Sequence, residues 1–192
     1  MTGPPDRAKG RRTLVLLALV ALAPIVASYT AYYWFTPSKR VNYGELIGPI
    51  AAPAIVGTTR DGGSFDLASS RGKWVLLVAT RSLCDAACEA ALHATKQVRT
   101  IQGRERERVV RVLLLPSDGP ALPAQELADD DALTVARVAP SALTALPLNA
   151  VGSVTLLILD PRGNIVLRYE ANPDVKRLSK DLERLLRASQ MG

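Results

Sequence analysis

The sequence predicts an α/β domain, a mixed sheet flanked by helices, preceded by one N-terminal transmembrane helix. An uncharged apolar run from Thr13 to Phe35 indicates the membrane helix. Three shorter apolar runs have the composition of strands buried on both faces: Val75–Ala79, Val109–Leu115 and Val154–Leu159. Helical periodicity follows the first of these runs and also closes the chain, so strands alternate with helices.

The N-terminal segment has the charge pattern of a single membrane anchor. Residues 1–12 are short, polar and basic. Residues 13–35, at about 1.5 Å per residue in a helix, can cross a hydrocarbon core of about 30 Å. Aromatic residues gather at the far end of the run, where headgroups would lie: Tyr29, Tyr32, Tyr33, Trp34 and Phe35. The basic residues predict a cytoplasmic N-terminus, with everything after Phe35 on the outside.

A cleaved signal peptide is the alternative interpretation of this run. It would use residues 14–25 as its apolar region and be cut near Ala27 or Ser28. We favour the uncleaved anchor, because the apolar character continues past that point. Cleavage would also leave the aromatic cluster as an exposed new N-terminus.

The rest of the chain is predicted to form a tether, residues 36–53, and one soluble domain, residues 54–192. The tether is rich in Pro and Gly and shows no clear periodicity. The domain opens with a hairpin from Ile55 to Leu67 around the turn Arg60–Gly63. Its length is sufficient to bury a core without disulfide staples.

Weaker elements are predicted in the second half of the domain. We expect a short helix at Gln125–Asp129, a strand at Leu133–Val138 and helical turns within Pro140–Leu146. Residues Ile165–Tyr169 are predicted to pair antiparallel with 154–159, because a turn containing Pro and Gly separates the two.

The final helix has a predicted start and a predicted core face. Asn172 is expected as the N-cap, with Pro173 at the first helical position. Five residues at helical spacing form one apolar stripe: Val175, Leu178, Leu182, Leu185 and Leu186.

The net charge of +6 does not by itself indicate a partner. Arginines are interspersed with acidic residues, and no basic stretch is interleaved with aromatic residues as in proteins that bind single-stranded nucleic acid. We therefore predict no nucleic-acid partner. The membrane topology explains part of the positive charge.

The candidate site is the pair Cys84 and Cys88, the only two cysteines of the chain. They lie where the loop after the strand Val75–Ala79 becomes a helix, predicted from about Asp85 to Gln102. This helix should pack on the sheet through an apolar face: Ala87, Ala91, Ala94, Val98 and Ile101. Backbone N–H groups and the dipole at a helix N-terminus favour the thiolate form of a thiol.

Three interpretations of the cysteine pair remain open: reactive or metal-binding thiols, a structural disulfide, and a relic site. Residues four apart share a helix face, with about 5–6 Å between Cβ atoms, which is slightly long for an unstrained disulfide. Cys84 at the cap would let the backbone adjust. Two thiolates can also bind Cu(I), a soft ion that accepts few ligands. We favour reactive or metal-binding thiols.

Two neighbouring residues are assigned lesser roles. His93, the only histidine, lies about 180° round the helix from Cys84 and should face solvent. Asp85 falls in the first helical turn, where a carboxylate caps the helix favourably.

Three residues of the strand before the cysteines, Trp74, Leu76 and Val78, are expected in the core.

The element order is that of a thioredoxin-type fold, and particular residues resemble the Sco/SenC family. They are Asp66-Leu67 with Gly72-Lys73-Trp74-Val75-Leu76, the Cys84-x-x-x-Cys88 spacing and the Asp160-Pro161-x-Gly163 turn. The whole plan is most similar to the small transmembrane Sco-like proteins of proteobacteria. The resemblance covers most of the chain after Asp66.

The resemblance implies a location, partners and a possible metal. It implies a single-pass protein of the bacterial inner membrane, with its main domain in the periplasm. Family members bind copper through two cysteines and a distant histidine, and deliver it to cytochrome c oxidase subunit II or reduce that subunit's cysteines. Cys84 and Cys88 match, but residues 149–155 hold no histidine and no proline precedes Val154.

These observations predict a membrane-anchored factor in cytochrome c oxidase assembly that uses thiol–disulfide chemistry or Cu(I) handling at Cys84 and Cys88. Its partners would be subunit II or other assembly factors, no cofactor is required, and copper is an optional ligand. The alternatives are a general thiol–disulfide oxidoreductase or peroxidase, for which Arg81 would be the activating residue, and a non-catalytic scaffold.

A fusion at the C-terminus tests the membrane topology. A reporter placed after Gly192 should be active only if it is one that works in the periplasm, because the basic N-terminus stays in the cytoplasm. Cytoplasmic activity would refute this topology. N-terminal sequencing of the mature protein is the companion measurement, since a start near Tyr29 would establish the cleaved signal peptide.

Overall fold

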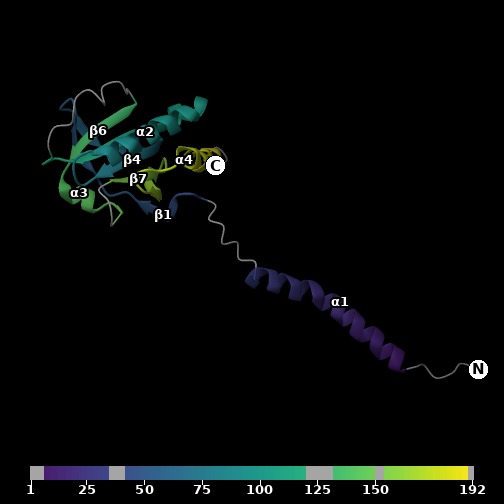
Figure 1. Ribbon diagram of the computed structural model, residues 1–192. Helices are drawn as coiled ribbons and strands as arrows, with labels where there is room; N and C mark the ends of the chain where they lie inside the picture. Colours follow the sequence, from purple (N-terminus) through teal and green to yellow (C-terminus); the bar gives the residue numbers. More distant parts are fainter. Residues whose placement is uncertain (1–6, 35–41, 120–131, 150–153, 190–192) are drawn as a thin grey trace, which may run out of the picture. The chain divides into compact units, whose positions relative to one another are not determined.

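The computed structural model of the chain describes residues 7–34, 42–119, 132–149 and 154–189 (Figure 1). The chain divides into two compact units, Met1–Val41 and Asn42–Gly192.

The first unit is built on α1, Arg7–Trp34. Its residues Gly10–Tyr33 form the one helix in the described part of the chain that is long and apolar enough to cross a membrane. Every side chain along these residues is exposed, so no protein core accounts for their apolar composition. The predicted N-terminal apolar helix is confirmed.

The second unit is built on one sheet with the strand order β1-β8-β7-β4-β5-β6-β2-β3. The strands are β1 Glu45–Ala51, β2 Val56–Thr59, β3 Ser64–Asp66, β4 Trp74–Thr80, β5 Val109–Pro116, β6 Leu133–Val138, β7 Val154–Leu159 and β8 Asn164–Tyr169. The helices are the 3₁₀ segments η1 Leu67–Ser70 and η2 Gly103–Arg108, and the α-helices α2 Ala86–Ile101, α3 Pro140–Thr144 and α4 Val175–Ala188.

The strand β4 lies at the centre of this mixed sheet. It runs parallel to β5 and antiparallel to β7, and β8 pairs antiparallel with β7. All the residues of β4 are buried, as its continuous apolar sequence requires. The β2–β3 hairpin continues the sheet through β6. The predicted single sheet and the predicted hairpin at Ile55–Leu67 are both confirmed.

Two hydrophobic clusters cover the two faces of the sheet. The helices α2 and α4 contact each other on one face (Figure 1), where they bury Ala91, Val98 and Leu182 against Leu76 and Val78. The other cluster includes Leu67 of η1 and Leu143 of α3. The predicted core faces of both helices are confirmed, except that Ile101 at the end of α2 is 60% exposed.

The tether prediction for residues 36–53 is wrong for Glu45–Ala51, which forms the edge strand β1 beside β8. Pairing shifts register between Leu46 and Ile50, where Gly48 takes a φ of +85° ahead of Pro49. An edge strand tolerates proline at such a bulge, so a segment rich in Pro and Gly still pairs. The compact unit accordingly begins at Asn42, and residues 35–41 lie outside the described part.

The predicted start of the last helix is also wrong. Asp174 is the N-cap, and its side chain accepts a hydrogen bond from the Arg177 N–H at 2.8 Å. Pro173 is buried before the helix begins. A carboxylate at the cap satisfies an amide of the first turn, and this determines the start. The helix predicted at Gln125–Asp129 lies outside the described residues.

A buried charge joins α2 to the sheet. Arg111 of β5 is 2% exposed. Its Nε donates to Thr95 Oγ1 at 3.1 Å, and its Nη2 donates to the Leu92 carbonyl at 2.6 Å. A buried guanidinium requires such partners, because removing a charge from water is costly.

A second buried charge fixes the start of the domain. The carboxylate of Asp181 in α4 accepts hydrogen bonds from the N–H groups of Tyr43 and Gly44 and from the Tyr169 hydroxyl, at 2.8, 3.0 and 3.0 Å. Burial, together with the charge of Asp181, raises the pKa of the Tyr169 hydroxyl well above its ordinary value of 10.0. Asp181 therefore connects the entry of the domain to its last helix.

This raised pKa predicts that stability falls at high pH. Above pH 10 the unfolded chain loses the Tyr169 proton and the folded chain keeps it, so stability declines by about 1.4 kcal/mol per pH unit for this group. In Tyr169→Phe this part of the decline should be absent. Urea unfolding of both proteins at pH 8 and pH 11, followed by tryptophan fluorescence, measures the difference. A stability gap that stays constant between the two pH values would contradict the assignment.

Candidate functional site

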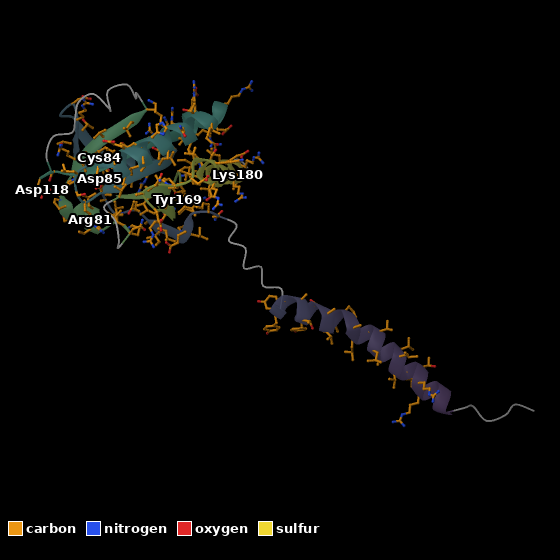
Figure 2. All side chains as sticks on the ribbon, viewed as in Figure 1. Arg81, Cys84, Asp85, Asp118, Tyr169 and Lys180 are labelled. Atoms are coloured by element: carbon orange, nitrogen blue, oxygen red, sulfur yellow. A yellow bond between two sulfur atoms is a disulfide. The ribbon has the colours of Figure 1, made fainter. Side chains whose placement is uncertain are left out.

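Cys84 and Cys88 form a disulfide between the end of β4 and the start of α2. Figure 2 shows Cys84 and Asp85 at one end of the domain, with Arg81 at the same end. Cys84 belongs to the loop after β4, and Cys88 lies in the first turn of α2. The strand and the helix thus bring together the two residues that the sequence singled out.

The two cysteines do not share a helix face, which corrects the sequence-based geometry. Because α2 begins at Ala86 with Asp85 as its N-cap, Cys84 precedes the helix and its backbone is free of the helical spacing. The Cα–Cα distance is 5.0 Å, within the range that a disulfide bridges. The non-helical backbone at Cys84, expected for a residue at the cap, allows the disulfide to form.

Asp85 caps α2 beside the disulfide. Its Oδ1 accepts hydrogen bonds from the N–H groups of Ala87 and Cys88, both at 3.1 Å. The predicted capping role is confirmed. A carboxylate here is stabilised by the helix dipole, and it places one fixed negative charge next to the sulfur pair.

The two cysteines differ in burial. Cys88 is fully buried in the cluster beneath α2, whereas Cys84 is half-buried at its edge. Leu83, immediately before Cys84, is 54% exposed. The outer half of the disulfide therefore adjoins an apolar side chain at the surface, and the inner half is shielded by the helix.

Asn149 forms hydrogen bonds with three other segments, one of them the loop after β4 that leads to Cys84, and sequence reasoning missed these contacts. Its N–H donates to Thr155 Oγ1 at 3.0 Å, and its side-chain amide donates to the Tyr169 carbonyl at 3.2 Å. Its carbonyl accepts from Arg81 Nη1 at 3.4 Å. These contacts join segments far apart in the chain, and no local pattern could have indicated them.

Arg81 makes no hydrogen bond to either cysteine among the described residues; its guanidinium is directed to Asn149. An activating arginine for a peroxidatic thiol must contact the reacting atoms. The arrangement therefore gives the peroxidase interpretation no specific support.

Reduction of the Cys84–Cys88 disulfide would give two soft sulfur donors that could bind copper. Thiolates are suitable ligands for the soft ion Cu(I), so the reduced pair fits that ion. His93 is exposed on α2 and lies 3.5 Å from the Gln97 side chain, in agreement with its predicted orientation toward solvent. Within the described residues no group of three or more His, Cys, Asp or Glu side chains could hold a metal.

Residues 74–189 match a family model described as "Transmembrane-like, thioredoxin-like, C-terminal domain". The match begins at the start of β4 and ends after α4, so it includes the disulfide. None of the curated proteins matches the chain.

Solved structures share the fold at low sequence identity. Yeast Sco1 with copper bound is 16% identical, with a TM-score of 0.59 over 71% of this chain and 92% of that one. BsSco, of the Sco family of cytochrome c oxidase assembly proteins and the subject of a reported disulfide switch, is 11% identical, with a TM-score of 0.56 over 74% and 96%. The thioredoxin domain of a Bacteroides vulgatus thiol-disulfide oxidoreductase is 18% identical, with a TM-score of 0.57 over 74% and 99%.

The burial difference predicts unequal thiol reactivity. After reduction, the thiol left in Cys88→Ser should react fast with an alkylating reagent, because Cys84 is accessible. The thiol left in Cys84→Ser requires local opening, and each 1.4 kcal/mol of opening free energy slows it about tenfold. Alkylation kinetics followed by mass spectrometry measure both rates. Equal rates, or a faster Cys88, would contradict the assignment of Cys84 as the outer thiol.

Proposed function

Because the chain belongs to the transmembrane-like, thioredoxin-like C-terminal domain family, we propose that it is a membrane-anchored factor that assists cytochrome c oxidase assembly through Cys84 and Cys88. The helix α1 serves as the single-pass anchor, with its N-terminus in the cytoplasm. The domain that begins at Asn42 then lies in the periplasm of a bacterial inner membrane.

The observation that carries this proposal is the disulfide at the capped N-terminus of α2, with one cysteine at the surface side and one buried. A structural disulfide that closes so short a loop removes little chain entropy from the unfolded state. Its placement where a thiolate is stabilised supports a redox role instead.

The thiol chemistry follows from the burial of the two sulfurs. In the reduced protein the Cys84 thiolate attacks a disulfide sulfur of the partner, and the partner's other sulfur leaves as a thiolate. Cys88 then attacks Cys84 in the mixed disulfide and releases the second partner thiol. The partner gains two electrons and two protons in all, and this chain ends with the Cys84–Cys88 disulfide.

Copper handling is the second form of the same proposal. The reduced pair can hold Cu(I) between two thiolates, and oxidation to the disulfide removes both donors. Sco1 from yeast was solved with copper bound, and this supports copper as a candidate for the present chain. In this proposal the ion is cargo.

A general thiol–disulfide oxidoreductase is the alternative function. The likeness to the oxidoreductase domain of Bacteroides vulgatus and the disulfide itself support it equally well. The two functions differ in their partner, because an assembly factor acts on an oxidase subunit and a general oxidoreductase acts on many proteins.

A genetic complementation experiment tests the proposed function. Cells that lack the chain should have reduced cytochrome c oxidase activity, restored by the wild-type chain and by His93→Ala, the matched control on the exposed face of α2. Cys84→Ser and Cys88→Ser should fail to restore it at equal protein levels. Restoration by both cysteine variants would establish the scaffold alternative. Unchanged oxidase activity in the deletion, with widespread loss of periplasmic disulfide reduction, would establish the general oxidoreductase.

Copper binding gives a separate test. We expect the reduced full chain in detergent to bind at most one Cu(I), since Cys84 and Cys88 are its only two cysteines, and we expect Cu(II) to oxidise the pair to the disulfide. Substituting His93→Ala should change neither result, and Cys84→Ser should abolish Cu(I) binding. Competition with a Cu(I) chelator and absorption spectroscopy measure these outcomes. A stable Cu(II) complex with a thiolate charge-transfer band would contradict the prediction.

A further inference from the structure

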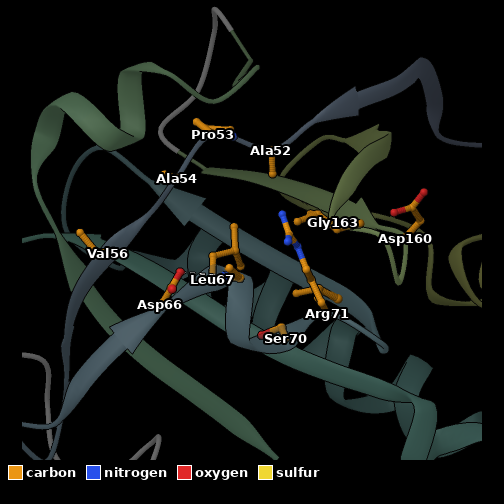
Figure 3. Close-up of a pocket in the computed structure, with 13 residues that line it drawn as sticks. Ala52, Pro53, Ala54, Val56, Asp66, Leu67, Ser70, Arg71, Asp160 and Gly163 are labelled. Atoms are coloured by element: carbon orange, nitrogen blue, oxygen red, sulfur yellow. Dashed lines mark hydrogen bonds between the residues drawn. The ribbon is translucent and has the colours of Figure 1, made fainter.

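A pocket of about 260 Å³ lies at the end of β4 opposite to the disulfide (Figure 3). Val75, near the start of β4, lines it, whereas Cys84 follows the other end of the strand. The strand separates the two sites by roughly 20 Å at about 3.3 Å per residue. The pocket is therefore independent of the redox site.

The floor of this pocket is apolar and rigid. It is formed by Leu67, Val75 and Leu159, which are 5, 2 and 1% exposed and belong to one hydrophobic cluster. The connection between β1 and β2, residues 52–54, forms one wall. A ligand here would contact apolar side chains that are already held in place by the core.

The two carboxylates at the rim are already engaged. Asp66 Oδ1 accepts from the Ala68 N–H at 2.9 Å. Asp160 Oδ1 accepts from the N–H groups of Arg162 and Asn164 at 2.9 and 2.8 Å, and its Oδ2 accepts from the Asn164 side chain at 2.9 Å. Through these hydrogen bonds both carboxylates stabilise turns.

The guanidinium of Arg71 is the charged group at the rim that lacks an acceptor among the described residues. Figure 3 shows its side chain crossing the pocket beside Gly163, where a Cβ on Gly163 would lie 3.4 Å from Arg71 Nε. Two backbone hydrogen bonds hold the chain at Arg71 and Gly72. Arg71 N–H donates to the Ala68 carbonyl at 3.2 Å, and the N–H of Gly72, whose φ is +87°, donates to the Pro161 carbonyl at 2.8 Å.

We propose that this pocket binds a small monocarboxylate with a short aliphatic tail. The planar fork of Arg71 matches a carboxylate in a bidentate pair, and the tail would cover Leu67, Val75 and Leu159. Hexanoate has a carboxylate and a short apolar tail and so combines both features.

Titration of the full chain with hexanoate tests the proposal. The ¹⁵N-labelled protein in detergent micelles should show saturable shifts of the Gly72 and Gly163 amides, and no shifts around Cys88. Arg71→Gln should weaken binding about tenfold or more, because it removes a charge-assisted hydrogen bond. Arg162→Gln, the matched control on the neighbouring turn and outside the lining, should bind like the wild type.

Two further ligands distinguish the contribution of the aliphatic tail from that of the carboxylate. Hexanol lacks the carboxylate and inorganic phosphate lacks the tail, so each should bind at least about tenfold more weakly than hexanoate. Ala54→Leu, at an exposed wall position, should block hexanoate by filling the pocket while the remaining spectrum stays native. Equal binding by Arg71→Gln, equal binding of hexanol or phosphate, or the lack of any saturable shift with hexanoate would overturn the proposal.

Discussion

The position of the disulfide depends on the buried contact between Arg111 and α2. Arg111 stands on β5 next to the central strand, and its guanidinium donates hydrogen bonds to the Leu92 carbonyl and the Thr95 hydroxyl of α2. A helix shifted along the sheet would lose these two buried hydrogen bonds to a charged group, each of which contributes about 1.5–3 kcal/mol. The apolar face of α2 slides more easily, because hydrophobic contacts are not directional. The polar contact therefore opposes sliding of the helix along the sheet.

The start of α2 in turn determines the chemistry of the cysteine pair. With the helix held at Arg111, its first turn falls directly after the β4 loop, where Asp85 caps it and Cys88 is enclosed by the core. Cys84 remains outside the helix and at the edge of the cluster. In the proposed thiol exchange, this short segment would supply an outer sulfur for attack on a partner and an inner sulfur for resolution. The central strand β4 leads into this segment, and none of its own residues is a cysteine.

The fold by itself does not identify the reaction. The solved structures with this architecture include copper-bound Sco1 and a domain of a thiol-disulfide oxidoreductase, and one fold supports many functions. The site of this chain is a disulfide beside the capping carboxylate of Asp85, and the one histidine of the chain, His93, is exposed on α2. The proposed electron exchange and Cu(I) binding would rest on this sulfur pair.

Sequence patterns by themselves determined the apolar N-terminal helix, the central strands and the placement of Cys84 and Cys88, because these depend on hydrophobic periodicity and on residue order. The edge strand β1 escaped prediction, since Gly48 and Pro49 disfavour a strand locally. Pairing with β8 stabilises this strand in the tertiary structure. The N-cap at Asp174 also escaped prediction, because Pro173 packs in the interior before the helix begins. Tertiary structure alone decided the contacts of Asn149, Arg111 and Asp181, and the pocket at Arg71. Each of these joins segments distant in the chain, and hydrogen bonds between such segments leave no periodic trace in the sequence.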